Sequence, residues 1–210
     1  TGKGSFISEN QIKVEMKDEV VILQAKRIFI NTGSTPIIPE IKGIKDNNKV
    51  YTSESIMELS ELPKRFSIIG GGYIGLEFAS IYANFGSKVT VFVRGDQILP
   101  REDQEIATEI ENVLKEKNID FKIRAQVEGV ENQEGKAVVS YLDKDSGKRD
   151  KCQADAILIA TGRKPNIEEL NLRAGKVEVT SKGAIKVDDY LRTTTKNIWA
   201  IGDVKGGPCD

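Results

Sequence analysis

The sequence predicts an α/β protein, in which a doubly wound domain of βαβαβ order with an added β-meander is flanked by two β-rich segments. Short apolar runs alternate with amphipathic stretches between residues 66 and 123, and a glycine cluster separates the first run from the first stretch. Apolar and polar positions then alternate over residues 124–153. We therefore expect three parts, over residues 1–45, 46–158 and 159–210 of this 210-residue chain.

The middle part follows a polar linker around Lys45–Asn48 and opens with a short apolar strand, Phe66–Ile69. Apolar residues then recur at the 3.6-residue spacing of a helix that packs on a sheet, and Gly86 ends that helix. The face predicted to be buried comprises Ile74, Phe78, Ile81, Tyr82 and Phe85.

The unit is completed by a second strand at Lys88–Val93, a helix from about Glu102 and a third strand at Ile119–Ile123. Because crossovers between strands of one sheet are right-handed, the βαβαβ order predicts a parallel sheet. The meander over residues 124–153 precedes a further buried strand, Ala156–Ala160. The inner face of the second helix is predicted to hold Ile106, Ile110, Val113 and Leu114.

The first and third parts resemble one another. Short strands around Ile12–Met16, Val20–Leu23 and Arg27–Ile30 lead into Thr32-Gly33-Ser34-Thr35-Pro36. The third part begins with the same strand-then-Thr-Gly-x-x-Pro pattern at Thr161–Pro165 and closes on Asn197–Asp203. We interpret the two parts as one kind of structure with the middle part inserted between them.

Composition excludes several classes of function. The net charge is −1 with no basic block, which argues against nucleic-acid or anionic-membrane partners, and no apolar run reaches the ~18 residues that a membrane span needs. Histidine is absent, which removes the commonest general base and metal ligand, so no metal site is expected. Cys152 and Cys209 have no paired spacing, and the default location is cytoplasmic.

The glycine cluster Gly70-Gly71-Gly72-Tyr73-Ile74-Gly75 matches G-x-G-x-x-G between a strand and a helix, the context of a dinucleotide-binding, Rossmann-like turn. We expect Gly70 to make the tight turn, Gly72 to let the backbone approach a pyrophosphate, and Gly75 to let helix and sheet pack closely. The amino terminus of the helix supplies N–H groups and partial positive charge for phosphates.

The end of the second strand decides which dinucleotide is bound. An acidic residue there would hold the ribose 2′-hydroxyl of NADH, but this chain has Val93 followed by Arg94. A guanidinium suits a 2′-phosphate, and Arg101 could join it. Asp96 lies close enough to leave NADH open. We favour NADPH over NADH.

These motifs together resemble the class I pyridine nucleotide-disulfide oxidoreductases, flavoproteins that include glutathione reductase, dihydrolipoamide dehydrogenase and mercuric reductase. The run from Gly70 to Glu77 resembles their NAD(P)H domain, and the two Thr-Gly motifs with Ala200–Val204 resemble their FAD-domain signatures. The resemblance implies that residues 1–45 and 159–210 are partial FAD-domain segments. It also implies hydride transfer from NADPH to flavin and then to a disulfide or another acceptor.

The resemblance assigns roles to single residues. Tyr73 matches a ring that covers the flavin until nicotinamide displaces it, and Glu77 matches a carboxylate that pairs with a lysine beside the flavin. These two are the implied catalytic residues. The remaining matches concern cofactor binding: the 2′-phosphate arginine Arg94 with a looser second match at Arg101, a nicotinamide-side backbone contact at Gly162, and the aspartate of the flavin ribityl chain at Asp203.

The departures from the family are equally informative. The family's FAD-binding glycine fingerprint, its Cys-x4-Cys pair and its dimerisation domain do not occur in this sequence, and both ends look cut. We therefore expect an NAD(P)H-binding piece of a larger, homodimeric FAD enzyme, inactive and colourless by itself.

Two other functions remain open. A regulatory module that senses the nucleotide without catalysis would share the glycine turn but would not need the Thr-Gly and Ile-Gly-Asp motifs. A complete single-domain dehydrogenase would need a proton donor, and Tyr141-Leu142-Asp143-Lys144 lacks the Tyr-x-x-x-Lys spacing.

Overall fold

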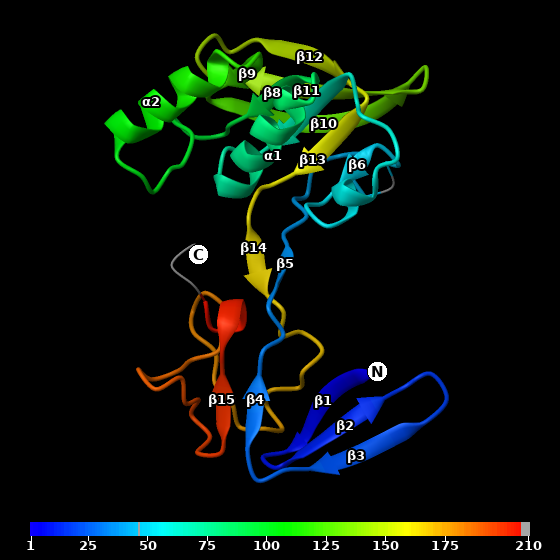
Figure 1. The fold of residues 1–210 in the computed structure, drawn as a ribbon, viewed down its shortest axis with the longest axis vertical. Helices are drawn as coiled ribbons and strands as arrows, with labels where there is room; N and C mark the ends of the chain where they lie inside the picture. Colours follow the sequence, from blue (N-terminus) through cyan, green and yellow to red (C-terminus); the bar gives the residue numbers. More distant parts are fainter. Residues whose placement is uncertain (46, 207–210) are drawn as a thin grey trace. The chain divides into compact units, whose positions relative to one another are not determined.

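The chain folds into two compact units in the computed structural model, which describes residues 1–45 and 47–206 (Figure 1). Unit 1 comprises Thr1–Thr35 and Arg163–Asp210, and unit 2 comprises Pro36–Gly162. Strands β5 (Ser34–Pro36) and β14 (Arg163–Pro165) pair with one another where the chain leaves and re-enters unit 1. Asp46 of the linker and Cys209, both considered above, lie outside the described residues.

The unit boundaries differ from the predicted borders after residues 45 and 158. The segment before the polar linker is held to the meander, because the amide of Val130 donates to the Lys42 carbonyl at 2.8 Å. Ile44 is buried in the core beneath that meander. The linker composition therefore marks a surface turn of unit 2 and not its edge.

The main sheet of unit 2 is parallel throughout, in the order β6-β13-β7-β8-β9. This confirms the βαβαβ prediction, with helices α1 (Tyr73–Asn84) and α2 (Gln104–Lys115) as the crossovers. The five strands are Val50–Tyr51 (β6), Ala156–Ile159 (β13), Arg65–Ile69 (β7), Lys88–Phe92 (β8) and Ile119–Lys122 (β9). A 3-10 turn, η1 (Ser55–Glu58), lies between β6 and β7.

The meander is antiparallel and consists of β10 (Ala125–Gln133), β11 (Lys136–Asp143) and β12 (Arg149–Ala154). Its apolar side chains pack with Ile69, Phe92, Ile157 and Ile159 on one side of the parallel sheet. The helices pack on the other side, where a second core forms. Unit 2 is therefore a three-layer structure of helices, parallel sheet and meander (Figure 1).

The predicted buried face of α1 is partly wrong. The buried residues of this helix are Gly75, Leu76 and Ala79, whereas Ile81 is 46% exposed and Phe85 is 69% exposed. Glycine and alanine face the sheet because they allow the helix to lie close to it, and the larger residues are displaced to the flank. Size as well as hydrophobicity therefore selected the inner face.

The inner face of α2 is shifted in the same way. Leu114 is buried and Ile110 is partly buried, as predicted, but Ala107 takes the place expected for Ile106. Ile106 and Val113 are 55% and 48% exposed. Asp103 begins the helix, and its side chain accepts a hydrogen bond from the Glu105 amide at 2.8 Å.

Unit 1 joins the first and last parts of the chain, as the repeated Thr-Gly pattern suggests. Strands β4 (Ile28–Ile30) and β15 (Ile198–Ala200) pair in parallel, and the 3-10 turn η2 (Gly202–Lys205) follows β15. An antiparallel sheet of β1 (Lys3–Ser8), β2 (Gln11–Glu15) and β3 (Val20–Gln24) accompanies them. Phe6, Ile185 and Ile198 lie in their shared core.

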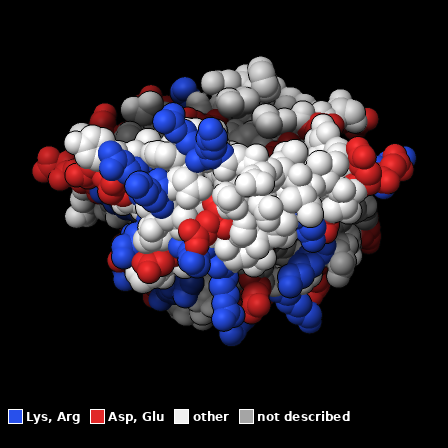
Figure 2. Space-filling model, turned by 90° about the horizontal axis from the view of Figure 1, so that it is seen from below, with Lys and Arg blue, Asp and Glu red and all other residues white. Residues whose placement is uncertain are grey.

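The surface carries charges of both signs. On the face drawn in Figure 2, Lys and Arg side chains are interspersed with Asp and Glu around a broad uncharged area. Within the described ranges, no helix is long and apolar enough to cross a membrane.

Candidate dinucleotide site

The glycine turn lies between the carboxyl end of β7 and the amino end of α1. Gly70 has a φ of +121°, and a Cβ there would come within 2.2 Å of the Ala160 carbonyl oxygen. Only glycine adopts this conformation at low cost and leaves room for the neighbouring backbone. The tight-turn role predicted for Gly70 therefore has a direct structural cause.

The other glycines of the motif have distinct roles. A Cβ at Gly75 would come within 2.3 Å of the Gly70 carbonyl oxygen, so Gly75 allows the helix to pack against the turn. A Cβ at Gly71 would come within 2.8 Å of Val93. At Gly72, by contrast, a Cβ would meet no atom within 4 Å, so the absent side chain leaves backbone open on the outer side of the turn.

The amino end of α1 is suited to bind an anion. Gly72 is its N-cap and supplies no side-chain hydrogen bond, and the first turn contains no acidic residue. The first N–H groups of a helix have no partner within the helix, and they carry partial positive charge. The open backbone at Gly72 and these N–H groups together fit a pyrophosphate.

The loop between β8 and α2 is attached to the glycine turn. The Leu99 amide donates to the Gly71 carbonyl at 2.8 Å, and the Glu102 amide donates to the Leu99 carbonyl at 2.9 Å. Ile98 is fully buried beside the turn. Arg94 and Arg101 thus lie on a loop that is hydrogen-bonded to the glycine turn.

Both candidate 2′-phosphate ligands are exposed at the ends of this loop. Arg94 directly follows buried Val93, and Arg101 precedes α2. In the part of the chain that the structure describes, neither guanidinium forms an ion pair. Asp96, the residue that left NADH open, forms an ion pair with Arg124 at 3.1 Å.

Tyr73 and Glu77 lie one turn apart on α1, and both are exposed. The Tyr73 hydroxyl donates to a carboxylate oxygen of Glu102, at the end of the anchored loop. Across the described residues, no Lys or Arg pairs with Glu77. Tyr73 is the first residue of α1 after the glycine turn, and the lysine partner that the family resemblance implies for Glu77 stays a prediction.

Gly162 belongs to unit 2 with the glycine turn. It has a φ of +132°, and its carbonyl accepts from the Ile37 amide at 3.0 Å. The Thr161 hydroxyl donates to the Ile37 carbonyl, also at 3.0 Å. The segment that ends at Gly162 directly follows Ala160, whose carbonyl lies against Gly70, so these backbones share one edge of the sheet.

Asp203 belongs to unit 1 and is exposed. Its carboxylate accepts from the Ser34 hydroxyl at 2.8 Å, and the Ser34 oxygen accepts from Arg163 Nε at 2.7 Å. A carboxylate that is oriented in this way and still open to solvent fits a ligand hydroxyl. The role of Asp203 toward the flavin ribityl chain stays a prediction from the family resemblance.

Three contacts were missed by sequence reasoning. The Leu99 amide anchors the loop, the Glu102 carboxylate accepts from Tyr73, and the Ala160 carbonyl sets the size limit at Gly70. None belongs to a motif, because each depends on a backbone approach between distant segments. The positive φ of Leu99, 45°, shows how unusual that loop conformation is.

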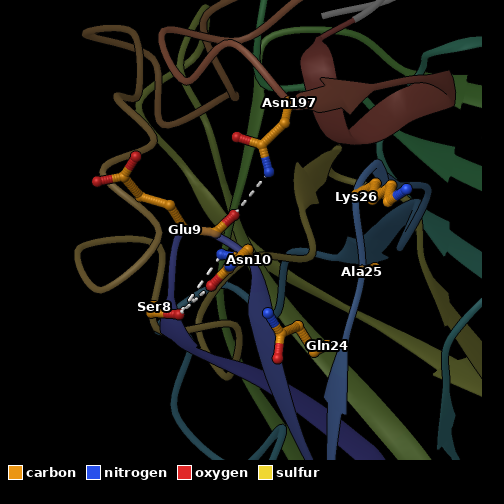
Figure 3. Close-up of a pocket in the computed structure, with 7 residues that line it drawn as sticks. All are labelled: Ser8, Glu9, Asn10, Gln24, Ala25, Lys26 and Asn197. Atoms are coloured by element: carbon orange, nitrogen blue, oxygen red, sulfur yellow. Dashed lines mark hydrogen bonds between the residues drawn. The ribbon is translucent and has the colours of Figure 1, made fainter.

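A separate polar hollow lies in unit 1 and does not involve the glycine turn (Figure 3). In it, the Asn197 side chain donates to the Glu9 carbonyl at 2.9 Å and Ser8 contacts Asn10. The hollow, of about 880 Å³, is lined by Ser8, Glu9, Asn10, Gln24, Ala25, Lys26 and Asn197.

Throughout the described residues, no group of three or more His, Cys, Asp or Glu side chains could bind a metal ion.

Known proteins resemble this chain over almost all of its length. A family model described as pyridine nucleotide-disulphide oxidoreductase matches residues 2–209. The probable pyridine nucleotide-disulfide oxidoreductase RclA of Escherichia coli (strain K12) is 40% identical over 206 residues, which are 98% of this chain and 45% of RclA. The dihydrolipoyl dehydrogenase of Geobacillus stearothermophilus is 36% identical over 99% of this chain and 43% of its own length.

Solved structures agree with these relatives. The HOCl-induced flavoprotein disulfide reductase RclA from Escherichia coli matches with a TM-score of 0.89 and 39% identity, over 98% of this chain and 45% of that one. Its Cu(II) complex matches with a TM-score of 0.91 over the same shares. The chain spans less than half the length of these relatives. The match over residues 2–209 nevertheless establishes that the chain belongs to the pyridine nucleotide-disulphide oxidoreductase family, whose members are flavin-dependent oxidoreductases.

Proposed function

We propose that unit 2 binds NADPH and that, in the intact enzyme, it presents the nucleotide to a flavin. The observation that carries this proposal is the open backbone at Gly72, where no protein atom lies within 4 Å of the missing Cβ, at the uncapped amino end of α1. The opening supports binding because it coincides with the strand–glycine turn–helix context of a dinucleotide-binding motif.

The residues around the turn then have separate tasks. Gly72 and the first N–H groups of α1 would hold the pyrophosphate, and Gly70 and Gly75 would keep the turn tight enough for that approach. Arg94 would bind the 2′-phosphate through charge-assisted hydrogen bonds. The absence of an acidic residue at Val93 supports NADPH over NADH, because no carboxylate stands at that position to accept from a ribose 2′-hydroxyl.

The remaining matched residues would serve the flavin side. NADPH supplies a hydride, which the family passes to FAD and then to a disulfide or another acceptor. Tyr73 would cover the flavin until nicotinamide enters, and Glu77 would act beside it. Asp203, oriented by Ser34, would accept a hydrogen bond from the ribityl chain.

Calorimetric titration of the chain with NADPH and NADH, side by side, tests the proposal. We expect NADPH to bind more tightly. Tighter binding of NADH would reverse the assignment of Arg94, and absence of binding by either would contradict the proposal for unit 2. Binding in an intact enzyme that never reduces flavin would favour a nucleotide-sensing module. We further propose a homodimer as the intact enzyme, with no nucleic-acid or membrane partner.

A further inference from the structure

The exit of β8 meets the hairpin turn between β11 and β12. The Arg124 amide donates to the Gly95 carbonyl at 3.0 Å, and the Lys144 amide donates to the Arg124 carbonyl at 3.1 Å. Two backbone hydrogen bonds thus connect the residue after Arg94 with the hairpin turn. The Lys144 ammonium lies 3.4 Å from the carbonyl oxygen of Arg94 itself.

The turn that carries Lys144 is well defined. The Asp143 carboxylate accepts from the amides of Asp145 and Ser146 at 2.8 and 3.1 Å, and these bonds lower the pKa of Asp143. The Gly147 amide donates to the Asp143 carbonyl at 2.9 Å. The backbone of Lys144 is therefore held in place, although its side chain is exposed.

Some charged side chains near Lys144 form ion pairs and others do not. Arg124 pairs with both Asp96 at 3.1 Å and Asp145 at 3.3 Å. Over residues 1–45 and 47–206, no carboxylate forms an ion pair with Arg94 or Lys144. Asp96 and Asp145 are thus paired with Arg124, and Asp143 accepts from backbone amides. Arg94 and Lys144 are two cations at the exit of β8 that form no ion pair within the described residues.

We propose that Lys144 is a second ligand of the nucleotide 2′-phosphate and therefore a determinant of NADPH specificity. This inference rests on the proposed binding of NADPH by unit 2. The Lys144 ammonium lies at the Arg94 carbonyl, at the end of β8. In dinucleotide-binding folds, the residue at this strand end contacts the 2′ position of the ribose. A phosphate dianion is bound best by more than one cationic donor. Arg94 is the first such donor, and Arg101 matches the family's second arginine only loosely. The Lys144 ammonium would therefore serve as the second cation.

The test measures NADPH and NADH affinities of the full chain and of Lys144→Gln by calorimetry. Lys148→Gln is the matched control, because it removes the same charge from the same exposed turn without a contact to Arg94. We expect Lys144→Gln to weaken NADPH about tenfold and NADH less than about twofold, and Lys148→Gln to change neither by more than about twofold. Lys144→Arg should retain most of the NADPH affinity, and added salt should narrow the difference between the wild type and Lys144→Gln.

The outcomes separate this inference from the function on which it rests. If the wild-type chain prefers NADPH and Arg94→Ala removes that preference while Lys144→Gln keeps it, the inference is wrong and the proposed function stands. If Lys144→Gln and Lys148→Gln lost NADPH affinity equally, the loss would be due to net charge, and the inference would also be wrong. A wild-type chain without preference for NADPH contradicts the proposed function, and the role of Lys144 fails with it.

Discussion

Two alanine substitutions in the glycine turn should have opposite consequences. Gly70→Ala places a Cβ within 2.2 Å of the Ala160 carbonyl oxygen at a φ of +121°, whereas Gly72→Ala places one where no atom lies within 4 Å. The strained backbone at Gly70 costs about 1–3 kcal/mol. The displacement of neighbouring backbone adds about 1–3 kcal/mol. Gly70→Ala should therefore remove a large part of a typical domain stability of about 5–15 kcal/mol.

Gly72→Ala should instead leave the fold intact and impair binding. Its φ of −83° is accessible to alanine, so the free energy of unfolding should change by less than about 1 kcal/mol. The new methyl group occupies the opening toward the pyrophosphate, and NADPH affinity should fall at least about tenfold, or about 1.4 kcal/mol.

Urea unfolding followed by far-ultraviolet circular dichroism measures the stability of unit 2, because both described α-helices belong to it. Calorimetry with NADPH measures binding. If Gly70→Ala were as stable as the wild type, the steric account of the turn would be refuted. If Gly72→Ala bound NADPH with unchanged affinity, the pyrophosphate would not approach the backbone there.

Three further substitutions test other parts of the molecule. Arg94→Ala should cost NADPH binding about 1–3 kcal/mol and NADH much less, and equal losses in calorimetry would contradict the 2′-phosphate assignment. Hydrogen bonds from the Arg65 guanidinium lower the pKa of Asp155, so the stability they contribute is full above the unfolded pKa of about 3.9 and is lost as pH falls through the lower folded value. Asp155→Asn should flatten this acid limb of stability in circular dichroism, and an unchanged limb would exclude the pair as its cause. Ser34→Ala removes the hydroxyl that joins the Arg163 guanidinium to the Asp203 carboxylate. It should lower the free energy of unfolding of unit 1 by about 1–2 kcal/mol, measured by Trp199 fluorescence during urea unfolding. An unshifted unfolding transition would show that these hydrogen bonds do not stabilise unit 1.

The sequence by itself determined the order of the elements and the position of the glycine turn at which we propose that the nucleotide binds. The periodicity of residues 66–123 predicts the parallel βαβαβ sheet, and the glycine spacing predicts the turn at Gly70–Gly75, because both depend on local backbone preferences. The two Thr-Gly motifs suggested that the first and last parts of the chain form one kind of structure, and these parts join in unit 1.

Only the tertiary structure decided which faces are buried and which side chains meet. Ile81 and Phe85 are exposed although they are apolar, because Gly75 and Ala79 let α1 lie closer to the sheet. Tertiary structure also placed Lys144 at the carbonyl of Arg94, across 50 residues of sequence. Contacts of this kind depend on how separate elements pack together. The side-chain pattern within one element does not specify which distant residue will contact it.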